Sequence, residues 1–459
     1  MTASASLALS GGGTKGAFEV GAVQYLSRNE DFLPPIITGT SVGSLIGGPL
    51  AQAHTPAEFT RLGHVVQENA LAVTRGGDVF GKQPWLDEIG DTPLGQFVDE
   101  LISVRSRPPV PPDPVGIHDP LLIPDPPRRH RTLFALSTAL THGTKFVKAG
   151  RALLEAGNSI MNLDPFEAGY RGIKTDGVRE VDERKVAESP IRLLLCLTSM
   201  RDGVSRYVTD QGIMVASDAN TPYEPGGTPG VIEGMLASSS VPMIFPPRRI
   251  GDDIYVDGGI LQNTPLEAAV RAGAGDVIAI LAGPDTVAQD DTDYTTASLL
   301  SVYQRAASEI GPHELGRENL RYPLKNGADL TIIMPTADVL GGFETEAGLI
   351  MIDFDYGWLR AAEATSDFDG IELADLHRAS DTIALQRERS WLLEDRILSQ
   401  GPQLNLVGAL RRARQHIVAA VTRWRASGLP ERRGMHDWGH MWEQHKQPVP
   451  EEYRQFALP

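Results

Sequence analysis

The sequence has little cysteine, no long apolar run and no excess of basic residues. Its single cysteine, Cys196, excludes an intrachain disulfide and a cluster of cysteine metal ligands, and its apolar surroundings predict a small buried side chain. No stretch approaches the roughly 18 consecutive apolar residues that a membrane-spanning helix needs. A net charge of −17 over 459 residues lacks the basic footprint of a nucleic-acid-binding protein.

The beginning of the chain also lacks the pattern of a secretory signal peptide, because no basic residue precedes its first apolar run. We therefore expect a cytoplasmic protein, with any membrane contact at the periphery. A chain of this length predicts one large domain with extensions. We expect a catalytic domain over 1–340 and a helix-rich C-terminal extension over 341–459.

Short apolar runs alternate with turns and helix-compatible stretches. The runs 7–9 and 36–38 predict strands, each followed by a helix, over 17–26 and 42–53. This order predicts a parallel α/β sheet, whose ligand sites lie at the carboxyl ends of the strands. Further strands are expected at 191–197, 254–256, 277–281 and 330–334, and further helices at 231–237 and 265–272.

The stretch 105–160 is predicted to be an insertion. Nine prolines in the twenty positions 108–127 exclude a regular element there, and 132–161 has the spacing of an amphipathic helix. Residues 101–151 carry a net charge of +5, which leaves −22 for the rest. A basic, amphipathic segment is typical of contact with a lipid surface, although most such helices pack on their own domain.

The pentapeptide Gly39-Thr40-Ser41-Val42-Gly43 links a predicted strand to a predicted helix. This context gives a Gly-x-Ser-x-Gly motif its meaning, since a tight turn then presents the hydroxyl at a helix N-terminus. The pentapeptide alone is equally compatible with an ordinary turn. Three histidines could in principle complete a Ser-Asp-His triad in the chain order of the α/β-hydrolase fold, namely His313, His377 and His416. Ser41 comes too early in the chain for that fold, however.

A glycine loop, Gly11-Gly12-Gly13-Thr14-Lys15-Gly16, follows the first predicted strand. Its backbone N–H groups could form the oxyanion hole of an acyl-transfer enzyme. The loop also matches the dinucleotide fingerprint Gly-x-Gly-x-x-Gly, which needs an acidic residue at the end of the second strand. Thr40 and Ser41 stand there instead, which disfavours nucleotide binding.

Asp257-Gly258-Gly259 follows the predicted strand 254–256. The carboxyl group could face the same crevice as Ser41, and burial would raise its pKa enough for it to act as a base. Asp-Gly-Gly alone is more often a turn. A pair of histidines, His436 and His440, has helical metal-ligand spacing, but Gly439 weakens the helix and no metal is expected.

In these three motifs, and in the run 237–247, the chain resembles the patatin-like phospholipase family. The resemblance covers roughly 5–340 and implies a three-layer α/β/α fold with a mostly parallel sheet. It implies that Ser41 is the nucleophile and Asp257 its base, that Gly12 and Gly13 supply oxyanion N–H groups, and that Lys15 supports the loop. It further implies a serine esterase of the phospholipase A type (EC 3.1.1), without cofactor, that cleaves phospholipids, lysophospholipids or acylglycerols. Two alternatives stay open: a catalytically silent or regulatory lipid-surface protein on the same scaffold and, with less support, a dinucleotide-binding enzyme.

Overall fold

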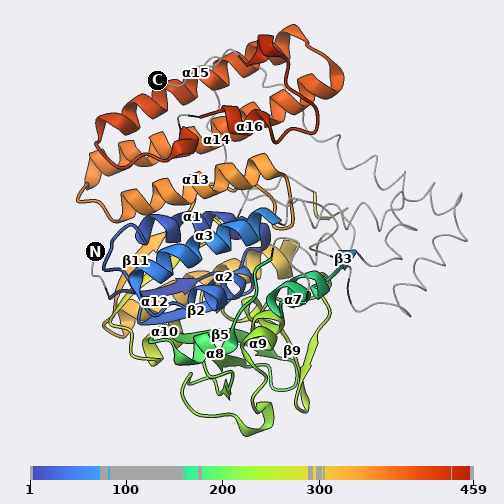
Figure 1. The fold of residues 1–459 in the computed structure, drawn as a ribbon, viewed down its shortest axis with the longest axis vertical. Coiled ribbons are helices and arrows are strands. Elements are labelled where there is room, and N and C mark those ends of the chain that lie inside the picture. Colours follow the sequence, from blue (N-terminus) through green and yellow to red (C-terminus); the bar gives the residue numbers. More distant parts are fainter. Residues whose placement is uncertain are drawn as a thin grey trace, which may run out of the picture.

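The fold is seen in a computed structural model (Figure 1). It describes residues 4–72, 81–82, 159, 161–173, 178–287, 293–295, 302, 305–435 and 437–454. Most of the predicted insertion and His436 therefore lie outside the described residues, and the proposed lipid-surface role of 105–160 stays a prediction. At the end of the expected helix 132–161, Met161–Asn162 forms a strand, so that helix is predicted too long.

Eleven strands are described. They are β1 (Ser6–Leu9), β2 (Ile36–Thr40), β3 (Gly81–Lys82), β4 (Met161–Asn162), β5 (Arg192–Ser199), β6 (Ser205–Thr209), β7 (Met214–Val215), β8 (Arg248–Ile250), β9 (Asp253–Asp257), β10 (Asp276–Ile280) and β11 (Asp329–Ile333). The six strands expected from the apolar runs are all present. The other five, β3, β4, β6, β7 and β8, were missed, since each has at most five residues and none contains a long apolar run.

The helices between and after these strands vary in length from a single turn to 31 residues. They are α1 (Gly16–Leu26), α2 (Val42–Leu50), α3 (Pro56–Ala72), α7 (Asp164–Tyr170), α8 (Glu183–Glu188), α9 (Val231–Ser238), α10 (Leu266–Arg271), α12 (Gly311–Lys325), α13 (Ala347–Ala364), α14 (Gly370–Gln400), α15 (Leu404–Ala426) and α16 (Gly439–Trp442). Short 3₁₀ or π turns are η1 (Gly13–Lys15), η4 (Glu224–Gly226), η5 (Gly258–Ile260), η6 (Arg305–Ile310), η7 (Arg433–Met435) and η8 (Glu451–Tyr453). No described helix is both long and apolar enough to cross a bilayer.

One nine-stranded sheet forms the centre of the fold, in the order β11-β10-β1-β2-β5-β6-β7, with β9 paired with β5 and β8 paired with β9. The first five strands of this order pair in parallel, and the others pair antiparallel. The expectation of a mostly parallel sheet is confirmed. The strand that ends at Asp257 departs from the parallel α/β order expected from the sequence, because β9 runs antiparallel to β5.

The alternation of side chains along each strand assigns the two faces of the sheet. Leu7 and Leu9 of β1 join the large core beneath α1, α2, α9 and α13, whereas Ala8 joins a smaller cluster with residues of α10. Figure 1 shows the resulting layers, with α10 and α12 on one side of the sheet and α1 and α13 on the other. The three-layer α/β/α fold is thus confirmed.

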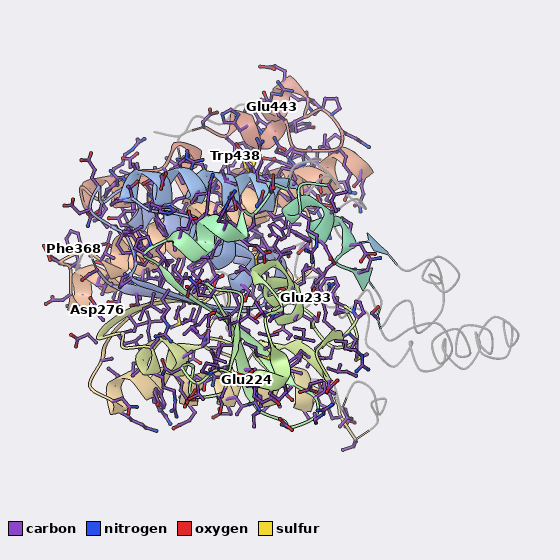
Figure 2. All side chains as sticks on the ribbon, turned by 60° about the horizontal axis from the view of Figure 1, so that its bottom comes forward. Glu224, Glu233, Asp276, Phe368, Trp438 and Glu443 are labelled. Atoms are coloured by element: carbon purple, nitrogen blue, oxygen red, sulfur yellow. The ribbon has the colours of Figure 1, made fainter. Side chains whose placement is uncertain are left out.

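The C-terminal helices stack on this core rather than trail from it. α13 packs along α1, α14 packs on α13, and α15 packs on α14 (Figure 1). Two glycines permit the first contact, since a Cβ on Gly21 or Gly357 would lie within 2 Å of a carbonyl oxygen of the facing helix. Trp438 and Glu443 lie in this outer helical region, far from Glu224 at the other end of the molecule (Figure 2). The helix-rich character of the C-terminal extension is confirmed.

Candidate active site

Ser41 stands at a strained turn between β2 and α2. Its φ of 54° and ψ of −124° are unfavourable for a residue with a side chain, and Ser41 is one of three described non-glycine residues with positive φ. Such strain is the mark of a nucleophile elbow, which holds the hydroxyl clear of the helix it precedes. Only 6% of the Ser41 surface is exposed.

Small neighbours make this elbow possible, as the sequence predicts. A Cβ on Gly43 would lie 2.5 Å from the Leu9 carbonyl oxygen, and one on Gly39 would lie 2.6 Å from the Gly43 carbonyl oxygen. The Gly43 N–H donates to the Ser10 carbonyl at 3.1 Å, which joins the elbow to the end of β1. Thr40 is fully buried and donates from Oγ1 to the Gln262 carbonyl at 2.8 Å.

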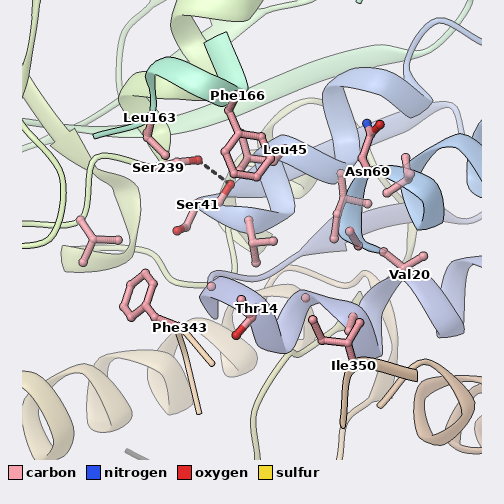
Figure 3. A pocket seen from close by; sticks show the side chains of 18 of the residues that line it. Thr14, Val20, Ser41, Leu45, Asn69, Leu163, Phe166, Ser239, Phe343 and Ile350 are labelled. Carbon is pink, nitrogen blue, oxygen red and sulfur yellow. Dashed lines mark hydrogen bonds between the residues drawn. The ribbon is translucent and has the colours of Figure 1, made fainter. Parts of the chain in front are cut away.

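Ser238, at the end of α9, stabilises the turn at Ser41 through hydrogen bonds of its hydroxyl. Its hydroxyl accepts the Ser41 N–H at 3.1 Å and lies 2.7 Å from the Ser44 hydroxyl. It lies 2.6 Å from the Cys196 carbonyl, to which it donates. Next to it, the Ser239 hydroxyl donates to the Ser41 carbonyl at 3.0 Å, a bond drawn in Figure 3. The serine run 238–240 was noticed in the sequence without a role, since only the fold brings it beneath Ser41.

Asp257 reaches Ser41 because two strands share one edge of β5. On that edge Thr40 of β2 stands opposite Cys196, and Asp257 of β9 stands opposite the next residue, Leu197. The other edge of β5 is occupied at Leu197 by β6. β2 and β9 therefore meet end to end, and their last residues lead directly to the serine and the carboxylate.

The Asp257 carboxyl group is buried and sparsely bonded. Oδ1 accepts the Gly259 N–H at 2.7 Å, while Oδ2 accepts no regular hydrogen bond from the described residues. Burial raises the pKa of Asp257 to about 6, against the weaker lowering effects of the Ser41 hydroxyl and the Gly259 N–H. The Ser41 hydroxyl thus lies close enough to lower the pKa of the Asp257 carboxyl group, although the two groups do not form a hydrogen bond of regular geometry. Such loose geometry is common before substrate binds.

The glycine loop lies against the serine. A Cβ on Gly11 would be 3.1 Å from the Ser41 Cβ and 2.5 Å from the Asn263 Oδ1. The Gly11 N–H donates to the Asn263 carbonyl at 2.9 Å, and the Asn263 side chain donates back to the Gly11 carbonyl at 3.2 Å. Sequence reasoning missed Asn263, which ties the glycine loop to the turn after Asp257.

Two backbone N–H groups of the glycine loop donate no hydrogen bond to the described residues. The Thr14 N–H donates to the Gly342 carbonyl at 2.7 Å, but in the described part of the chain the N–H groups of Gly12 and Gly13 have no acceptor. Gly13 has a φ of 61°, and a Cβ there would come within 1.9 Å of the Gly342 oxygen. Only glycine fits this approach. The loop can therefore offer two donors to an oxyanion.

An apolar pocket opens at Ser41 (Figure 3). About 720 Å³ between its walls is free of atoms, part of it open to solvent. The lining includes Val42, Leu45, Phe166, Phe245 and Phe343. Among the described residues no histidine lines it, and His313 and His377 pair instead with Asp285 and Glu363. The described residues contain no cluster of metal-ligating side chains.

The fold and the site together indicate the class of protein to which the chain belongs. A three-layer α/β/α domain, with a serine elbow opening into an apolar pocket, has the architecture of a lipid acyl hydrolase. The chain belongs to the patatin-like phospholipase family, whose sequence model, described as "Patatin-like phospholipase", matches residues 7–143 and 196–270. Membership of this family implies lipid acyl hydrolase activity in general terms.

Solved structures that are similar to this chain include VipD from Legionella pneumophila. It is 14% identical, the match covers 92% of this chain and 83% of VipD, and the TM-score is 0.31. The ExoU–SpcU complex from the type III secretion system of Pseudomonas aeruginosa gives 15% identity, coverage of 98% and 73%, and a TM-score of 0.24. No curated protein matches the chain.

Proposed function

We propose that this protein is a serine esterase of the phospholipase A type that cleaves carboxylic esters of phospholipids, lysophospholipids or acylglycerols. Ser41 is the nucleophile, Asp257 the base, and the N–H groups of Gly12 and Gly13 the oxyanion donors. The observation that carries the proposal is the strained serine beside a buried carboxyl group, at the mouth of an apolar pocket.

The reaction needs no group beyond these. The Asp257 carboxylate takes the proton of the Ser41 hydroxyl as Oγ attacks the ester carbonyl carbon, and the carbonyl oxygen becomes an oxyanion facing Gly12 and Gly13. The intermediate collapses, the bond to the alcohol breaks, and the leaving alcohol takes the proton from Asp257. Water then repeats the sequence on the acyl-serine and releases the fatty acid and the free serine.

The pKa of Asp257, raised to about 6, supports the role of base. An unperturbed aspartate near 3.9 would have little affinity for the serine proton. A group that titrates near 6 binds it more strongly and is still mostly ionised at neutral pH. The apolar lining of the pocket supports an acyl chain as the part of the substrate bound beside Ser41.

The test compares wild type with Ser41→Ala and Asp257→Asn on p-nitrophenyl esters and on a defined phospholipid mixture. We expect both variants to lose at least about a thousandfold in kcat/KM, as when members of a catalytic unit are removed. In wild type, kcat/KM should fall tenfold per pH unit below about 6. A fluorophosphonate should label Ser41 covalently.

Asp253→Asn is the matched control, because Asp253 is also a buried acid of β9 and accepts the Ser199 hydroxyl at 2.5 Å. It should keep most of the activity of wild type. An active Ser41→Ala protein would refute the mechanism, and a wild type without esterase activity would favour the silent lipid-surface protein.

A further inference from the structure

α3 carries a polar residue on its inner, apolar face. Phe59, Leu62 and Val66 of this face are buried at helical spacing, and the next buried position is Asn69, with 4% of its surface exposed. An aliphatic residue is expected at such a position. A buried amide therefore needs a reason, because its polar atoms lose water when they are enclosed.

A structural contact explains the oxygen of the Asn69 amide but not its nitrogen. The Asn69 Oδ1 accepts the Arg179 N–H at 2.8 Å, which ties α3 to the segment before α8. Since only the oxygen can accept that N–H, the contact fixes the amide orientation and turns Nδ2 the other way. Nδ2 is buried and has no acceptor among the described residues. A buried donor without a protein partner needs an explanation, and one that lies in a pocket wall is placed to bind an atom of a ligand.

The same side chain lines the pocket that opens at Ser41. Figure 3 shows Asn69 and Val20 on the side of the pocket away from Ser41 and Phe343. Val20, which lies on the same side in Figure 3, is apolar, and so are Val66 and Ala70, the other α3 residues that line the pocket. The pocket wall thus holds, at a distance from the nucleophile, a hydrogen-bond donor without an acceptor among the described residues, beside apolar side chains that suit a hydrocarbon chain.

We propose that Asn69 is a specificity-determining residue, and that the acyl group bound in this pocket carries a hydrogen-bond acceptor oxygen, keto or hydroxyl, part-way along its chain. The inference rests on the proposed function, in which this pocket holds the acyl group, and deepens it by naming the substrate class. A plain hydrocarbon chain leaves the buried Nδ2 without an acceptor, whereas an oxygenated chain supplies one.

The experiment separates binding from turnover. Methyl decanoate and a set of methyl oxodecanoates, with the keto group at successive carbons, are titrated into Ser41→Ala protein by calorimetry. We expect one keto position to bind about tenfold more tightly than the plain ester. The corresponding p-nitrophenyl esters should show the same preference in kcat/KM with wild type.

Two variants remove the donor in different ways. Asn69→Leu removes the whole amide, and Asn69→Asp keeps the acceptor for the Arg179 N–H while replacing the Nδ2 donor. Both should abolish the preference for the keto chain. Gln67→Leu is the matched control, because Gln67 is an amide on the same helix that binds Gln24 at 2.6 Å and does not line the pocket. It should keep the preference.

Equal binding of plain and keto esters to Ser41→Ala protein, or a preference that survives in both Asn69 variants, overturns the inference. Hydrolysis of plain p-nitrophenyl decanoate by wild type is independent of that result and bears only on the proposed function. If wild type hydrolyses no ester while the binding preference is present and depends on Asn69, the proposed function fails and the site stands as an acyl-binding site.

Discussion

At the scale of single residues, burial raises the pKa of Asp257. The same burial that makes the carboxylate a stronger base also lowers the free energy of unfolding at neutral pH, because the folded state encloses a charge. The Asp257 carboxyl group is enclosed and has one regular hydrogen-bond donor, the Gly259 N–H. The folded state therefore binds the proton more tightly than the unfolded chain does. Its contribution to stability is greatest below the unfolded pKa of about 3.9 and is lost as the pH rises toward 6.

Asp257→Asn should consequently stabilise the protein at pH 8. Asparagine can still accept the Gly259 N–H, and it carries no buried charge. A shift of about two pKa units corresponds to about 3 kcal/mol as an upper value. Denaturant unfolding at pH 8 and pH 4 checks this: the variant should exceed wild type at pH 8, and the difference should shrink at pH 4. A variant less stable than wild type at pH 8 would contradict it.

At the scale of elements, the loop between β11 and α13 clamps the glycine loop. The Thr14 hydroxyl donates to the Gly341 carbonyl at 2.8 Å, and the Thr14 N–H donates to Gly342. Lys15 forms a 2.7 Å ion pair with Asp338, whose side chain is fully buried. The supporting role expected for Lys15 has this geometry behind it and stays a proposal. The partner, more than 300 residues away, could not be found from the sequence.

Asp338→Asn should lower kcat about 10- to 100-fold with little change in KM. Without its partner, Lys15 no longer holds the loop, and misplaced N–H groups weaken oxyanion binding more than substrate binding. Lys15→Met should have a similar effect, and the double variant should lose little more, because the two residues act as a unit. Steady-state kinetics on a p-nitrophenyl ester measure this.

Asp329→Asn, an exposed acid at the start of β11, is the control and should behave as wild type. Unchanged kcat in a folded Asp338→Asn protein would show that the ion pair does not position the loop. Fully additive losses in the double variant would show that Lys15 and Asp338 act separately.

At the scale of the whole molecule, the C-terminal tail is bound to the outer helices by a buried polar network. His445 lies between two carboxylates of α14, with its ring nitrogens 2.8 Å from Glu394 and 2.8 Å from Asp395. Two such bonds need two N–H donors and hence a protonated ring. Burial alone would lower the pKa of His445, but these two bonds outweigh it and raise the pKa. Arg414 of α15 pairs with the other Glu394 oxygen at 2.7 Å.

Because the folded pKa of His445 is raised, its stabilising effect is fully present below about pH 6.5 and is lost as the pH rises through the folded value. His445→Gln should therefore destabilise the protein by about 1.5–3 kcal/mol at pH 6, the range for a hydrogen bond to a charged group, and by less at pH 9. Chemical denaturation at the two pH values checks this. His416→Gln, an exposed histidine of α15, is the control. A loss of unfolding free energy that is the same at both pH values would contradict a stabilising role of the protonated His445 ring.

The division near residue 340 stays a prediction, and the contacts across it show how closely the two parts cooperate. The Phe18 N–H of α1 donates to Asp353 of α13 at 3.1 Å, and the rings of Phe18 and Tyr356 pack edge to face. A chain cut at residue 340 would expose this face of α1. It would also remove Gly341 and Gly342 from the glycine loop.

The sequence by itself determined the elements whose signal is local. Buried strands appear as short apolar runs, and the turns at Gly11–Gly16, Gly39–Gly43 and Asp257–Gly259 need particular residues at adjacent positions. The tertiary structure alone decided what these turns meet. β9 runs antiparallel and ends against β2, Ser238 and Asn263 support the site from distant segments, and the Asn69 amide of α3 lines an apolar pocket. Such contacts depend on register and packing between residues far apart in the chain, for which a single sequence carries no periodic signal.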